Sequence, residues 1–102
     1  MNTLIEHIIR ELNEMQSILY INEFNREANA IKSFTDIIKK NRIDDLKNKN
    51  FNKELTLIID ALTNPKGLSD LYPKKIAHSE WQSQLYNASN HLIKLKKELK
   101  LR

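Results

Sequence analysis

The sequence contains no cysteine and a single glycine among its 102 residues. Disulfide bonds and thiolate chemistry are therefore excluded, and so are the glycine-rich loops that bind nucleotide phosphates. No stretch approaches the ~20 apolar residues that a membrane-spanning helix needs. The first residues also lack the basic segment and apolar run of a signal peptide. From these absences we expect a soluble cytoplasmic protein.

The composition is that of a folded domain, with 40% hydrophobic and 29% charged residues. Disordered chains of this length have fewer apolar residues and a more one-sided charge. A chain of this size buries enough surface for one hydrophobic core. We therefore expect one domain over residues 1–102.

Apolar residues recur at alternating spacings of three and four, which is the period of an amphipathic helix. The longest series is a seam in the last third of the chain: Trp81, Leu85, Ala88, Leu92, Leu95 and Leu99. Helices are predicted over residues 3–19, 22–40, 51–62 and from 79 nearly to the end, with one helical turn at 43–46. Because nothing alternates with the period of a strand, we predict an all-α fold, a mostly antiparallel four-helix bundle.

Local patterns predict where these helices begin and end. Two capping boxes start the first and last helices, Thr3 with Glu6 and Ser79 with Gln82. Asn22 is the expected cap of the second helix, and Asn48 and Asn50 favour a turn and a new cap before the third. Gly67 is expected to end the third helix with a positive φ. Residues 63–78 then form an ordered loop, which is folded onto the core by its apolar side chains.

The charge is divided unevenly along the chain. Residues 1–30 contain two bases and five acids, whereas residues 31–102 contain fifteen bases and eight acids. An acidic first helix can lie beside a basic last helix, since antiparallel neighbours commonly pair in this way. The same division can instead serve an external partner. The sequence leaves both interpretations open.

Histidines and carboxylates are the candidate catalytic and metal-binding groups of this sequence. His7, Glu11 and Glu14 share one helical face and offer one nitrogen and two oxygen ligands. Two-metal bundles use a Glu-x-x-His motif that this sequence lacks, so a solvated polar face is the simpler interpretation. Neither His78 nor His91 has a nucleophile at a recognisable spacing. We therefore predict no catalytic, metal-binding or cofactor-binding residues, and expect the protein not to be an enzyme.

Two groups of basic residues are candidates for contact with nucleic acid. The first group is Lys39, Lys40, Arg42, Lys47, Lys49 and Lys53, and the second is Lys94, Lys96, Lys97, Lys100 and Arg102. Cations at the C-terminus of a helix also interact favourably with its dipole, which explains part of the pattern without a partner.

One segment resembles a known group of proteins. Residues 67–72, Gly-Leu-Ser-Asp-Leu-Tyr, follow a helix patterned Phe51-x3-Leu55-x2-Ile58-Ile59-x2-Leu62. This arrangement resembles small helical bacterial domains in which such a turn joins the last two helices. That group includes proteins encoded beside secreted antibacterial toxins. The resemblance covers roughly residues 20–100 and implies an immunity protein, with no catalytic residues to transfer.

The sequence therefore predicts a non-enzymatic binding protein, with an immunity protein that blocks the active site of a cognate toxin as the leading hypothesis. The alternatives are a small basic helical protein associated with nucleic acid, and a homodimeric helical adaptor. The predicted partner contacts combine acidic residues and amphipathic aromatic residues. They are Glu11, Glu14, Glu23, Tyr72 and Tyr86.

Overall fold

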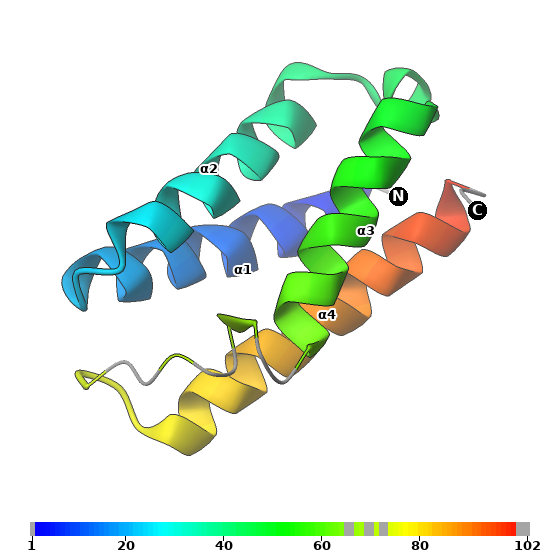
Figure 1. The fold of residues 1–102 in the computed structure, drawn as a ribbon. Coiled ribbons are helices and arrows are strands. Elements are labelled where there is room, and N and C mark those ends of the chain that lie inside the picture. Colours follow the sequence, from blue (N-terminus) through cyan, green and yellow to red (C-terminus); the bar gives the residue numbers. More distant parts are fainter. Residues whose placement is uncertain (1, 65–66, 69–70, 72–73, 100–102) are drawn as a thin grey trace.

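A computed structural model describes residues 2–64, 67–68, 71 and 74–99, with the backbone alone described for Asn2 and Ile43. The described residues form four α-helices, with a 3-10 turn between the second and third, and no strand among them. In chain order these are α1 (Asn2–Ile21), α2 (Asn25–Lys40), η1 (Ile43–Leu46), α3 (Lys49–Thr63) and α4 (His78–Glu98), as Figure 1 shows. The predicted all-α bundle is confirmed.

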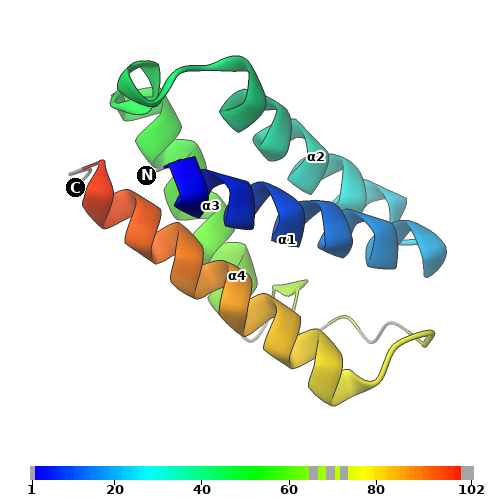
Figure 2. The same ribbon diagram turned by 180° about the vertical axis from the view of Figure 1, so that it is seen from behind.

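The bundle has two distinct ends. The start of α1, the α2–α3 connection and the end of α4 lie together at one end in both views (Figures 1 and 2). We call this the terminal end. The α1–α2 turn and residues 74–77 lie at the other end, which we call the turn end. Segments far apart in the sequence are thereby brought to the same end of the molecule.

The core is built from the apolar stripes that the helical period predicts. All six residues of the predicted seam are buried, and Trp81 has no exposed surface. The stripe of α1 is at most 1% exposed at Ile8, Leu12, Met15 and Leu19. Burial of one such side chain contributes about 1.5–3 kcal/mol. A single chain therefore covers the seam without a second copy.

Two aromatic contacts join elements that the sequence separates. Phe34 of α2 stacks on Phe51 of α3 with ring centroids 5.7 Å apart. The indole N–H of Trp81 donates a 3.0 Å hydrogen bond to the carbonyl of Leu68. Leu68 is buried and Leu71 is half-buried. Leu68 and Leu71 therefore fold back onto the core, as predicted.

Several predicted helix starts were wrong by one to three residues. α1 begins at Asn2 and α4 at His78, so Thr3 and Ser79 lie in the first turn and not at the N-cap of either capping box. The N-cap of α4 is Ala77, which makes no side-chain cap bond. Boundaries shift by this much because capping patterns are short and degenerate.

The predictions for asparagine had different outcomes, and Asn50 lies within the first turn of α3 and does not cap it. Asn48 caps α3, because its side-chain oxygen accepts a 2.8 Å bond from the Phe51 N–H. Asn22 was wrongly predicted to cap α2, whose N-cap is Phe24. The Asn22 amide is instead used at the end of α1, where it donates to the carbonyl of Ile18 at 2.7 Å.

Gly67 was wrongly predicted to need a positive φ, since the structure shows no glycine with one. Its role is steric. A Cβ added at Gly67 would overlap the backbone carbonyl oxygen of Ala61. The Gly67 N–H also donates a 2.9 Å bond to the carbonyl of Asn64. Glycine is therefore required because the chain folds back closely against the end of α3.

The substitution Gly67→Ala is expected to destabilise the fold by about 1–3 kcal/mol, because a backbone atom must move to admit the methyl group. Urea denaturation followed by circular dichroism measures this change. Lys74→Ala, at an exposed position of the same connection, is the control. An unchanged midpoint for Gly67→Ala would contradict the close approach.

Candidate functional site

A polar strip runs along the line where α1 meets α4. His91 Nδ1–H donates to the Glu11 carboxylate at 2.6 Å. The Gln84 amide donates to the Glu11 carbonyl at 3.3 Å and to the Glu14 carboxylate at 3.2 Å. The order of these contacts shows that α1 and α4 are antiparallel. The strip therefore fixes how α1 lies against α4.

The imidazoles of this strip are stacked on one another. His7 lies against His91 with ring centroids 5.7 Å apart and planes inclined by 16°. The Arg10 guanidinium donates to His7 Nδ1 at 2.6 Å, so both rings are engaged through Nδ1. Ring-nitrogen lone pairs lie in the ring plane, and those of near-parallel rings do not converge on one ion.

The helical face of His7, Glu11 and Glu14 does not form a metal centre. Glu11 turns to His91 and Glu14 to Gln84, so the three candidate ligands are directed to different partners. Among residues 2–64, 67–68, 71 and 74–99, no three histidine or acidic side chains are grouped to hold a metal. We interpret the strip as an interhelical contact.

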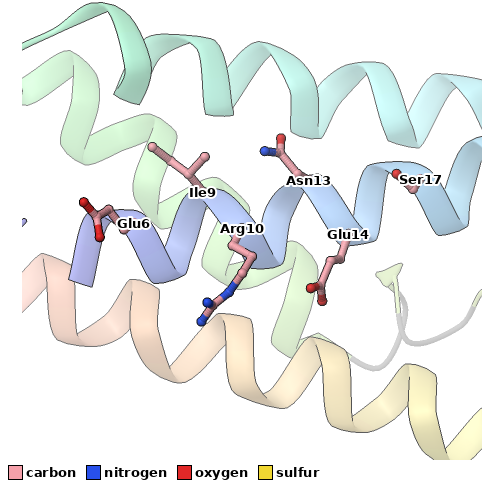
Figure 3. Close-up of a pocket in the computed structure, with 6 residues that line it drawn as sticks. All are labelled: Glu6, Ile9, Arg10, Asn13, Glu14 and Ser17. Carbon is pink, nitrogen blue, oxygen red and sulfur yellow. The ribbon is translucent and has the colours of Figure 1, made fainter. Parts of the chain in front are cut away.

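No helix of the part of the chain that the structure describes covers the outward side of α1 (Figure 2). A shallow hollow on this side is lined by six residues, Glu6, Ile9, Arg10, Asn13, Glu14 and Ser17. Figure 3 shows Ile9 and Asn13 directed toward α2, and Arg10 and Glu14 directed toward α4. We call these six residues the α1 face. It carries two carboxylates and one guanidinium at the surface.

The α1–α2 turn contains the one positive φ among the described non-glycine residues, 67° at Glu23. The Phe24 N–H bonds to the Leu19 carbonyl at 2.8 Å and the Glu23 N–H to the Tyr20 carbonyl at 3.1 Å. This is the bonding pattern of a Schellman motif with Glu23 at the left-handed position. Glycine is strongly preferred there, because a Cβ raises the energy of that conformation. The chain therefore carries local strain at Glu23.

The residues around Glu23 form the surface of the turn end. Tyr20 is 41% exposed and Ile21 is 56% exposed. A hollow of about 380 Å³ is lined by residues 21–24 together with Lys74 and Lys75. We call Tyr20, Ile21, Glu23, Lys74 and Lys75 the turn surface. It combines exposed apolar side chains with charges of both signs.

Asn22 holds the two segments of the turn surface together. Its side-chain oxygen accepts a 2.9 Å hydrogen bond from the Lys75 N–H, while its amide group closes the end of α1. The 74–75 segment is thereby fixed against the α1–α2 turn. Sequence reasoning missed this contact because the two residues are 53 positions apart and neither belongs to a recognisable motif.

The five predicted contact residues do not form one surface. Glu14 and Glu23 are exposed along α1 and its end, whereas Glu11 is half-buried against His91. Tyr86 is 67% exposed. It lies two residues beyond Gln84, so it is turned about 200° around α4 from the side that faces α1. Tyr72 lies outside the described residues.

Comparisons with known proteins found no relative. No protein-family model matches the chain, and no curated protein or solved structure matches it. No helix within the described ranges is long and apolar enough to span a membrane.

The pair Glu11–His91 is expected to show a coupling free energy of about 1–2 kcal/mol, because it is a short, partly buried bond to a charged group. A double-mutant cycle with Glu11→Ala and His91→Ala, read by urea denaturation, measures it. Additive effects of the two substitutions would show that the contact does not stabilise the packing of α1 on α4.

The substitution Glu23→Gly is expected to stabilise the fold by about 0.5–1 kcal/mol, because glycine adopts the left-handed conformation without a Cβ clash. Glu23→Ala is the matched control, since it removes the carboxylate but keeps the Cβ. Thermal and urea denaturation compare the two. If both variants gained equally, the carboxylate and not the backbone would be the source of the strain.

Proposed function

We propose that this protein is a non-enzymatic binding protein whose partner contacts the turn surface and the adjoining α1 face. The observation that carries this proposal is Glu23 in the left-handed conformation. A residue that costs stability and has a better local alternative points to a role outside the fold. The exposed carboxylate of Glu23 stands beside Ile21 and Tyr20, so a partner can use all three.

The chemistry of the two surfaces suits a protein partner. Interfaces are enriched in aromatic residues and contain apolar side chains rimmed by polar groups. Tyr20 and Ile21 supply exposed apolar area. Glu14 and Glu23 supply acidic groups at the surface. Basic groups on the partner complement Glu14 and Glu23, and acidic groups complement Lys74 and Lys75, because charge complementarity speeds association and excludes wrong partners.

We further propose that the partner is a toxin and that the chain acts as its immunity protein. The proposed mechanism is steric: a folded helical domain sits over the toxin's active site. Such a role needs a well-packed scaffold and a complementary surface, and no chemistry by the inhibitor itself. The sequence resemblance at residues 67–72 supports the same role. A basic nuclease toxin would fit the exposed carboxylates of Glu14 and Glu23.

Co-expression with the protein encoded by the neighbouring reading frame tests this proposal. We expect the two chains to co-purify, and the double variant Glu14→Lys/Glu23→Lys to weaken the complex at least tenfold. Glu54→Lys/Asp60→Lys, at two exposed positions of α3, makes the same change of charge and is the matched control, which is expected to bind normally. Titration calorimetry on the purified chains measures the affinities.

Two results would contradict the proposal. One is that the neighbouring frame encodes no toxin-like protein, or encodes one that the folded chain does not bind. The other is a complex that the double variant and the control weaken equally, which would place the contact elsewhere on the molecule.

A further inference from the structure

The terminal end gathers the two basic groups that the sequence separates by about forty residues. The first group lies on the end of α2, the α2–α3 connection and the start of α3, and the described members of the second group lie on the last turns of α4. Both views show these segments at the same end of the bundle (Figures 1 and 2). The described bases there are Lys39, Lys40, Arg42, Lys47, Lys49, Lys53, Lys94, Lys96 and Lys97. We call these nine residues the basic end.

The basic end outweighs the acids around it. All nine bases are exposed except Lys96, which is half-buried and donates to the Thr56 hydroxyl at 3.1 Å. Lys47 lies 3.9 Å from the Asp44 carboxylate. The acidic residues at this end are Glu6, Asp36, Asp44, Asp45, Glu54 and Glu98. Nine bases therefore face six acids, and the excess is positive.

Helix dipoles explain only part of this excess. Lys39 and Lys40 end α2 and Lys96 and Lys97 end α4, where cations are favoured. Lys49 and Lys53 instead lie at the N-terminus of a helix, where cations are disfavoured. They occupy the first two turns of α3, whose first turn contains no acidic residue. Cations there oppose the dipole, and like charges four residues apart repel.

Pairing with the acidic first helix does not account for the lysines either. α1 does lie beside α4, as the internal interpretation of the charge pattern requires. The contact between an α1 carboxylate and a basic side chain of α4 is made by His91, to Glu11. Lys94 and Lys97 are exposed, and Lys96 turns to α3.

We propose that the basic end binds the phosphate backbone of a nucleic-acid duplex without sequence specificity. Closely spaced phosphates attract clustered lysines and release counterions on binding. Lysine ammonium groups act as point charges and read no base edges. Single strands are bound by stacking on exposed aromatic side chains. No aromatic side chain is exposed among the described residues of this end, where Phe34 and Phe51 are buried, and so a duplex is favoured.

Fluorescence anisotropy with labelled DNA and RNA duplexes of about 20 base pairs tests the proposal, with salt raised from about 50 to 200 mM. We expect binding at low salt that weakens steeply as salt rises. The variant Lys49→Glu/Lys53→Glu is expected to lose at least tenfold in affinity and to lower the salt slope by about two. Circular dichroism is expected to show an intact fold, because glutamates suit the start of α3.

The matched control is Lys74→Glu/Lys75→Glu, which makes the same change of charge at the turn end. It is expected to retain most of the affinity, within about threefold. Equal losses for the two variants would show that net charge alone explains the binding, and would overturn the proposed site. Absence of duplex binding at low salt would overturn it too. Tighter binding to a single strand of equal length, or to vesicles containing anionic phospholipid, would assign the surface to a different partner.

Discussion

The structure depends on the burial of one apolar stripe of α1 between α2 and α4. Ile8, Leu12, Met15 and Leu19 are at most 1% exposed, and the seam of α4 closes the core beside them. This packing decides what the rest of α1 can do. Its flank toward α4 must carry polar groups that satisfy one another, as Glu11 and His91 do. Its outward side is left uncovered, and its end projects into the α1–α2 turn.

At three places the residue present is not the one that its local backbone favours. Comparing these places shows which residues the fold needs and which it does not. Gly67 lies where no positive φ requires glycine, but the carbonyl of Ala61 leaves no room for a Cβ. Glu23 occupies a position that favours glycine, and Lys49 and Lys53 oppose the dipole of α3. Packing accounts for the first of these. We propose that Glu23 and the two lysines instead serve partners outside the fold, which bind at opposite ends of the bundle.

The sequence was sufficient for the fold because the helical period is a repeated signal. The seam from Trp81 to Leu99 and the short turn at Ile43–Leu46 follow from spacing alone. The candidate site was only partly accessible. Glu23 was selected for its charge, whereas its backbone conformation depends on how α1 ends. Two contacts of the site join distant residues: His91 with Glu11, 80 positions apart, and Asn22 with Lys75, 53 positions apart. No local sequence pattern predicts either contact.

Glu23 is held in the left-handed conformation that closes α1, where glycine would be less strained and where the fold does not require a glutamate. Backbone chemical shifts and three-bond amide couplings of the free, isotopically labelled chain test it most directly by nuclear magnetic resonance. We expect a left-handed conformation at Glu23, with the carbonyls of Leu19 and Tyr20 still accepting the bonds that close α1. A Glu23 in the right-handed helical or extended region would contradict it.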